Sequence, residues 1–228
     1  MSIIQIKKLT KTYHDTEVPV HAVNGIDLNF EEGEFTAIVG PSGCGKTTLM
    51  NMIGGLEKPT SGSVLIGGSK MSELSSSELI DFRLKNIGFV FQAYNLIPVL
   101  TAKENVEFIM QLQNWDRKNM DERTIALLES VGLGDKLNSK PNQLSGGQQQ
   151  RVAVARALAS KPKFILADEP TANLDSKATT QLLDIMEKLN KEENITFIFA
   201  THDQRVMDKA RRVITLVDGK VFSDTGKE

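Results

Sequence analysis

The fold is decided by residues 35–56, which read "FTAIVGPSGCGKTTLMNMIGGL". The opening apolar run "FTAIV" predicts a short strand buried on both faces. "GPSGCGKT" (40–47) fits the pattern G-x-x-x-x-G-K-[S/T], and apolar side chains at helical spacing follow it. Strand, glycine-rich loop and helix in this order predict a phosphate-binding loop, because glycines let the backbone turn around an anion and the helix adds its N-terminal dipole. The alternative is an ordinary glycine-rich turn.

Within this loop, Lys46 is predicted to reach the β- and γ-phosphates of a nucleotide, and Thr47 to give a hydroxyl to Mg²⁺. Cys44, the only cysteine, is interpreted as a small loop residue; a single cysteine excludes an internal disulfide and favours a reducing cytosol. The residues predicted to contact the nucleotide here are Gly40, Pro41, Ser42, Gly43, Cys44, Gly45, Lys46, Thr47 and Thr48.

Two carboxylates end a second apolar segment, "FILADEP" (164–170). A buried strand tolerates charge only where it emerges, so this position indicates a site at the carboxyl end of a strand. Asp168 is predicted to hold Mg²⁺, and Glu169 to polarise an attacking water. Taken alone, the pair is equally consistent with a solvated acidic turn.

A second glycine-rich helix start, "NQLSGGQQQRVA" (142–153), lies far from the first in the sequence. Ser145 and Gln148 have the spacing of a capping box, and the glycines between them leave backbone N–H groups unshielded. Such a start is either a simple helix cap or an anion site. As an anion site it serves the same nucleotide as the first loop, from the opposite side, or else the two starts serve two nucleotides between two copies of the chain.

The rest of the chain favours an α/β protein with a small β layer and a helical insertion. A hairpin is predicted around Asp218-Gly219. The net charge of −2 gives no support for nucleic-acid binding. No apolar run approaches the length of about 20 residues that spans a bilayer, and the first residues do not read as a signal peptide. A membrane role therefore requires a separate anchor.

Together, "LSGGQQQR", "GPSGCGKT", "FILADEP", the glutamine of "FVFQ" and the histidine of "FATHD" resemble the ATP-binding cassette (ABC) ATPases over residues 3–223. The resemblance implies one ABC ATPase domain over 1–228: a P-loop NTPase (RecA-like) α/β core, an N-terminal antiparallel β subdomain and an inserted helical subdomain at about 93–160. It also implies a head-to-tail homodimer that holds two MgATP, with the LSGGQ helix of one subunit over the nucleotide of the other.

The same resemblance assigns roles to single residues. It makes Tyr13 the aromatic that stacks on adenine, Gln92 a contact of Mg²⁺ or of the attacking water, and His202 the sensor of the γ-phosphate. Glu169, His202, Gln92 and Lys46 form the expected catalytic set, and Thr47, Gln92 and Asp168 the metal set. The residues expected to act on the partner's nucleotide are Ser145, Gly146, Gly147, Gln148 and Asp175. Asp175 also suits the N-cap of a following helix.

A finer resemblance, to the lipoprotein-releasing and macrolide-exporter ATPases (LolD/MacB type), rests on "EVPVHAVNGIDL", "GGLEKPTSG" and "GFVFQAYNLIPVLTAKENV". It implies a cytoplasmic subunit of an exporter, bound at the inner face of the membrane through a separate permease. Two alternatives remain: an ATPase that regulates an envelope process without transport, and a soluble ABC protein acting on ribosomes or DNA. The apolar segment after Gln92, residues 94–100, is interpreted as core or, from its position, as the surface that docks the permease.

Overall fold

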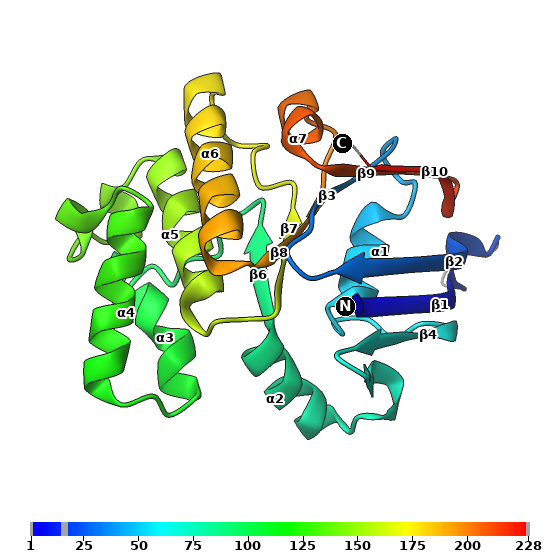
Figure 1. Ribbon diagram of the computed structural model, residues 1–228, viewed down its shortest axis with the longest axis horizontal. Coiled ribbons are helices and arrows are strands. Elements are labelled where there is room, and N and C mark those ends of the chain that lie inside the picture. Colours follow the sequence, from blue (N-terminus) through cyan, green and yellow to red (C-terminus); the bar gives the residue numbers. More distant parts are fainter. Residues whose placement is uncertain (1, 15–17, 227–228) are drawn as a thin grey trace.

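The computed structural model describes residues 2–14 and 18–226, and its strands form two sheets (Figure 1). The smaller sheet is antiparallel and has the order β2-β1-β4-β5. Its long strands β1 and β2 show partial apolar alternation, because one face packs on the core and the other meets solvent. The bounds are β1 (Ser2–Tyr13), β2 (Val20–Glu31), β4 (Ser61–Ile66) and β5 (Ser69–Lys70).

The larger sheet has the order β10-β9-β3-β8-β7-β6, and every neighbouring pair is parallel except the edge hairpin β9-β10. That hairpin turns at Asp218 and Gly219, both with positive φ, as the sequence predicts. All five residues of β3 and of β8 are buried. The bounds are β3 (Phe35–Val39), β6 (Ile87–Phe91), β7 (Phe164–Asp168), β8 (Thr196–Ala200), β9 (Arg212–Val217) and β10 (Lys220–Gly226).

Helices cover both faces of the larger sheet, which explains its continuous apolar strands. In β7, Ile165 and Ala167 join a core under α3, α4, α5 and α6, while Phe164 and Leu166 join a core under α1 and the smaller sheet. The helices are α1 (Lys46–Ile53), α2 (Ser76–Asn86), α3 (Ala102–Leu112), α4 (Arg117–Ser130), α5 (Gly146–Ala159), α6 (Ser176–Glu193) and α7 (Gln204–Lys209). Short 3₁₀ turns lie at Met71–Glu73, Gly134–Lys136 and Pro141–Gln143.

The predicted fold class is confirmed: an α/β core of the P-loop type carries an antiparallel β layer and a group of packed helices. Within residues 2–14 and 18–226, the helices are either too short or too polar to cross a bilayer. The carboxyl ends of β3, β6, β7 and β8 meet at one edge of the larger sheet. The first three strands are followed directly by a predicted site residue, and His202 is the second residue after β8.

Candidate functional site

The predicted phosphate-binding loop joins β3 to α1, the strand and helix that the motif requires. The N-cap of α1 is Gly45, with φ of 100°, and it has no side chain to occupy the N–H groups of the first turn. A side chain at Gly45 would also overlap the carbonyl oxygen of Ala22, so only glycine fits. Lys46 Nζ donates to the carbonyl oxygens of Gly40 (2.7 Å) and Pro41 (3.0 Å). The loop thus presents a cation and free N–H groups to an anion.

Asp168, at the end of β7, lies against the helix that this loop opens. The Thr47 hydroxyl donates to Asp168 Oδ1 at 3.3 Å. Burial raises the pKa of the Asp168 carboxyl and Glu169 adds to the rise, while the bond from Thr47 and the charge of Lys46 oppose it. A cation at this carboxylate would compensate its burial.

Thr47 and Asp168 fit Mg²⁺ as oxygen ligands. Mg²⁺ prefers oxygen and is usually held by one or two protein groups together with phosphate and water. In the part of the chain that the structure describes, no three His, Cys, Asp or Glu side chains come together as a metal site. An ion here would therefore need oxygen ligands from a bound nucleotide and water.

Glu169 adopts an uncommon backbone conformation, with φ of 46°. Its N–H donates to the carbonyl oxygen of Ala200 at 2.9 Å, which ties the end of β7 to β8. Its carboxylate accepts from His202 Nδ1 at 2.8 Å and from the Thr201 hydroxyl at 3.3 Å. Because a carboxylate can only accept, Nδ1 of His202 carries a proton in this bond.

Gln92 follows β6, and the parallel register places it beside Glu169, because Phe91 pairs with Asp168. The Gln92 side chain is exposed, and its backbone carbonyl accepts from Asn173 Nδ2 at 3.0 Å. The structure therefore brings Lys46, Thr47, Asp168, Glu169, His202 and Gln92 to one edge of the larger sheet. Sequence reasoning missed Thr201 and Asn173. Their only signal is position, because Thr201 precedes the predicted His202 and Asn173 lies two residues before the predicted Asp175.

Tyr13 ends β1 close to the start of α1. Its hydroxyl hydrogen-bonds the side chains of Glu57 and Thr48, and Lys11 Nζ lies 5.0 Å from the ring centroid. Burial and the bond to Glu57 raise the pKa of Tyr13. The predicted aromatic and the predicted Thr48 are therefore neighbours beside the phosphate-binding loop.

The second glycine-rich start is the N-terminus of α5, and its capping box forms as predicted. Ser145 Oγ accepts from the Gln148 N–H at 3.3 Å, and Gln148 Oε1 accepts from the Ser145 N–H at 2.9 Å. A methyl group on Gly146 would lie 2.7 Å from the Tyr94 hydroxyl, and one on Gly147 would lie 3.1 Å from the side chain of Ala178. The glycines thus let α5 pack closely against its surroundings.

Asp175 is the N-cap of α6, and its Oδ1 accepts from the Ala178 N–H at 2.8 Å, as the capping interpretation requires. It stands next to the start of α5, which abuts Ala178 at Gly147. This pair of helix starts does not meet the phosphate-binding loop within the chain. Helices α5 and α6 belong to one core and α1 to the other, and Figure 1 shows them on opposite sides of β6, β7 and β8.

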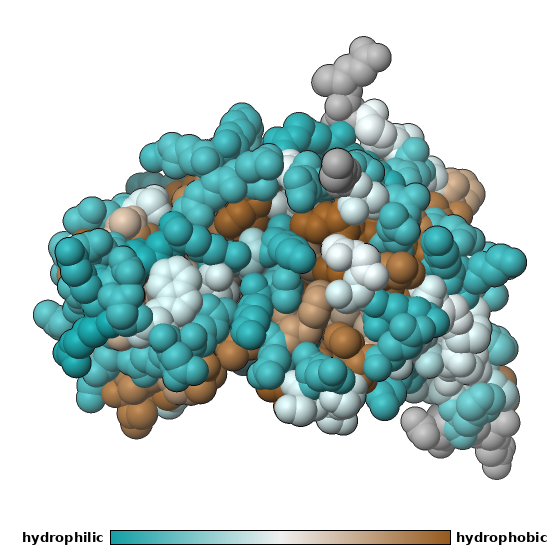
Figure 2. Space-filling view, turned by 60° about the horizontal axis from the view of Figure 1, so that its bottom comes forward, coloured by the Kyte–Doolittle hydropathy of each residue, from teal (hydrophilic) through white to brown (hydrophobic). Residues whose placement is uncertain are grey.

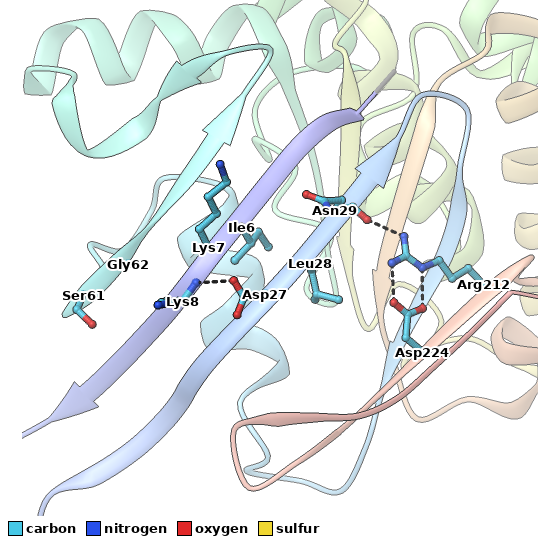
Figure 3. Close-up of a pocket in the computed structure, with 10 residues that line it drawn as sticks. All are labelled: Ile6, Lys7, Lys8, Asp27, Leu28, Asn29, Ser61, Gly62, Arg212 and Asp224. Carbon is cyan, nitrogen blue, oxygen red and sulfur yellow. Dashed lines mark hydrogen bonds and ion pairs between the residues drawn. The ribbon is translucent and has the colours of Figure 1, made fainter.

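A cavity of about 850 Å³ lies away from these residues, over β1, β2, β4 and the β9-β10 hairpin (Figure 3). In its lining Arg212 bonds Asp224, and Asp27 accepts from the backbone N–H of Lys8. None of the predicted site residues lines this cavity. Volume alone therefore does not indicate the site.

Comparison with known proteins gives consistent results. The family described as "ABC transporter" matches residues 23–172. An ABC transporter ATP-binding protein of Methanocaldococcus jannaschii is 49% identical over 99% of this chain and 100% of its own length. The lipoprotein-releasing system ATP-binding protein LolD of Legionella pneumophila is 42% identical over 97% of both chains. The macrolide export protein MacB of Hyphomonas neptunium is 46% identical over 99% of this chain, which spans 35% of that longer protein.

Solved structures agree with these relatives. The ATP-binding cassette MJ0796, determined as a dimer in a post-hydrolysis state with ADP and Pi, superposes with a TM-score of 0.90. It is 44% identical, and the match covers 99% of both chains.

Proposed function

The chain belongs to the ABC transporter family of ATP-binding proteins and is an ATPase, and from this premise we propose that it hydrolyses MgATP in a homodimer to drive a separate membrane permease. The observation that carries the proposal is the meeting of Lys46, Asp168 and the Glu169–His202 pair at one sheet edge. One site would then combine a phosphate-binding cation, oxygen ligands for Mg²⁺ and a carboxylate that activates water.

In the proposed reaction, Glu169 orients the attacking water through its carboxylate. The bonds from His202 and Thr201 restrict that carboxylate, so little reorganisation is needed. Lys46 would leave its loop carbonyls to meet the β- and γ-phosphates, and His202 would donate to the γ-phosphate from Nε2 when that nitrogen carries a proton. Thr47, Asp168 and Gln92 would hold Mg²⁺, which neutralises charge developing on the phosphates. Tyr13 would stack on adenine, next to Thr48.

The proposed dimer follows from the separation of α1 and α5 within one chain. A second copy, arranged head to tail, would supply Ser145, Gly146, Gly147, Gln148 and Asp175 to the nucleotide on the phosphate-binding loop. The dimeric state of MJ0796, with ADP and Pi, supports this arrangement. Residues 93–160 would act as the helical subdomain that carries the α5 start onto the partner's nucleotide.

An apolar groove of about 570 Å³ suits the permease contact. It lies between α2, β6 and α3, where Phe108 and Leu112 are exposed, and Figure 2 shows hydrophobic surface among polar residues with this side of the molecule brought forward. Its two cations, Arg83 and Arg156, bond backbone carbonyls, and no carboxylate lines it in the described part of the chain. We propose that it receives an apolar permease segment with an acidic end.

The apolar residues after Gln92 are interpreted either as core or as the surface that docks the permease, and they include both packed and exposed side chains. Leu96 packs against the helical core, Ile97 lines the groove, and Val99 is 71% exposed. Because this segment begins beside the hydrolytic site, it would report nucleotide binding to a docked permease. Val99 is the residue of the three that is open to a partner.

The similarity to LolD and MacB supports an exporter whose cargo is a lipoprotein, a peptide or a drug, with this subunit on the cytoplasmic face of the membrane. The alternative is an ATPase that regulates an envelope process through a membrane partner without transport. Identification of the integral membrane protein that copurifies with the native chain separates the two.

The hydrolytic proposal is tested with Glu169→Gln. The amide keeps the shape of the side chain and loses the charge that polarises water, so ATP binding should remain while hydrolysis falls by about 100-fold or more. With hydrolysis blocked, the variant should collect as an ATP-bound dimer. Size-exclusion chromatography with and without ATP measures this; a variant that stays monomeric in saturating ATP contradicts the dimer.

A further inference from the structure

A glutamine of helix α5, Gln150, occupies a position that the proposed reaction does not use. It is the third glutamine of "GGQQQR", and its side chain is fully buried. Its amide Nε2 donates to the carbonyl oxygen of Pro170 at 2.8 Å and lies 3.4 Å from that of Phe91. Pro170 directly follows Glu169, and Phe91 directly precedes Gln92. One amide group therefore contacts the peptides next to both side chains at the sheet edge.

The orientation of this amide is fixed by its neighbours. Both neighbouring atoms are carbonyl oxygens, which can only accept, so the NH₂ group must face them. The Phe91–Asp168 register puts the two carbonyls at adjacent strand ends, and Gln150 spans them from the side of α5. Its Oε1 is buried and has no hydrogen-bond partner among the residues that the structure describes.

A purely structural role would not favour glutamine here. The other buried residues of α5 are all alanine, valine or leucine. A buried amide with an unpartnered oxygen costs free energy that an apolar side chain of similar size would avoid. The two bonds that it makes, rather than its packing, distinguish this side chain from its neighbours on the helix.

The backbone next to Gln150 is the part of the site that needs support. Glu169 has φ of 46°, a conformation that persists in a non-glycine residue only where the surroundings hold it. The Ala200 carbonyl holds the peptide before Glu169, and Gln150 holds the peptide after Pro170. We propose that Gln150 is a positioning residue, whose amide lets helix α5 set the orientation of the Glu169 carboxylate and of Gln92.

This inference rests on the proposed function and adds a connection between its two nucleotide sites. Gln150 lies two residues after Gln148, on the helix whose start would contact the partner's nucleotide. A shift of α5 on that nucleotide moves Gln150 against Pro170 and Phe91. Each subunit would thereby adjust its own water-activating carboxylate according to the nucleotide held by its partner.

The test uses Gln150→Met, which keeps length and approximate volume and removes both hydrogen bonds. We expect kcat to fall about 10-fold with the KM for ATP and the melting temperature nearly unchanged, because binding residues are untouched. Gln149→Met is the matched control: that side chain is on the same helix turn and donates to the Leu144 carbonyl instead. It should keep kcat within about 2-fold of the wild type. A Gln150→Met kcat at the wild-type level, or a fall matched by equal losses in affinity and melting temperature, overturns the proposal.

A second variant, Gln150→Glu, supplies a readout that packing alone would not move. The protonated carboxyl can donate to the Pro170 carbonyl, whereas the ionised form only accepts, and burial raises the pKa of such a group. Its kcat should therefore fall relative to the wild type as pH rises through that pKa. A pH profile parallel to the wild type overturns the proposal. The same assay separates this proposal from the proposed function. If Glu169→Gln hydrolyses ATP at the wild-type rate, the role of Glu169 is refuted. If Glu169→Gln is inactive and Gln150→Met keeps full activity, only the role of Gln150 is refuted.

Discussion

The two glycine-rich helix starts of the chain use their glycines in opposite ways. At α1, Gly45 has φ of 100° and its lack of a side chain lets the backbone turn beside Ala22. At α5, Gly146 and Gly147 have ordinary helical backbone and make room for Tyr94 and Ala178. The first start leaves its N–H groups open, while the second gives one of them to the Ser145 hydroxyl. Glycine content alone thus does not distinguish a turn around an anion from a surface built for close approach.

This difference predicts that the two helix starts have different roles in binding and hydrolysis. The loop before α1 carries a cation and suffices to bind nucleotide within one chain, whereas the start of α5 has no charged side chain and needs a nucleotide already held elsewhere. Variants of the first region should therefore change binding, and variants of the second should change hydrolysis.

The largest expected effect is that of Lys46→Ala. Removing a cation that would face several phosphate charges should weaken MgATP binding by about 100-fold. At a nucleotide concentration of about 100 times the wild-type Kd, the wild type gains about 2.7 kcal/mol of stability and the variant loses most of that gain. Thermal unfolding with and without MgATP measures it. An undiminished rise in melting temperature would show that the loop is not the nucleotide site.

The next prediction concerns residues 94–100, which lie in the sequence between the α1 and α5 helix starts. Arg156 of α5 donates to the carbonyls of Tyr94 and Asn95, just after Gln92. Leu96→Glu should cost about 2 kcal/mol, because it places a carboxylate against the helical core. Val99→Glu is the control at an exposed site and should unfold like the wild type while losing assembly with the permease. Melting temperature and copurification measure the pair; if Val99→Glu still assembles, the permease docks elsewhere.

The sequence predicts those parts of the site whose residues lie close together along the chain. A strand, a glycine-rich loop and a helix follow one another around Lys46, so their contacts are local. The pairing of β6 with β7 was not readable, because parallel neighbours are joined by long connections. For the same reason the sequence does not reveal the contacts of Gln150, because its partners Phe91 and Pro170 lie 59 and 20 residues away.

Residues 93–101 illustrate a second limit of sequence reasoning. The family resemblance begins the helical subdomain at about residue 93, yet the first helix there, α3, begins only at Ala102, after the Thr101 N-cap. Tyr94 and Asn95 have positive φ, and the carbonyls that they leave outside a helix are bound by Arg156. A distant side chain therefore stabilises a backbone that local propensity does not favour. The boundary of the helical subdomain at about 93–160 stays a prediction.

A smaller effect is expected at the second helix start. Gly147→Ala adds a methyl group 3.1 Å from Ala178, on the surface that would approach the partner's nucleotide. Alanine suits a helix better than glycine, so stability should not fall. MgATP affinity should stay near the wild type while kcat drops about 10-fold, which corresponds to about 1.4 kcal/mol. A loss of affinity like that of Lys46→Ala would mean that both regions bind one nucleotide within a single chain.

The smallest expected effect distinguishes helix capping from catalysis, because the capping box at α2 has the same hydrogen-bond distances as the one at α5. Ser75 and Glu78 at α2 repeat the geometry of Ser145 and Gln148 at α5, with bonds of 2.9 and 3.3 Å in each. Ser75→Ala and Ser145→Ala should each cost about 1 kcal/mol, or about 2–4 °C in melting temperature. Only Ser145→Ala should also lower kcat, since α2 does not carry the surface proposed to meet the partner's nucleotide. If the two variants lose stability and activity equally, Ser145 is a helix cap and nothing more. The comparison of the two glycine-rich starts would then reduce to one nucleotide site and one ordinary helix.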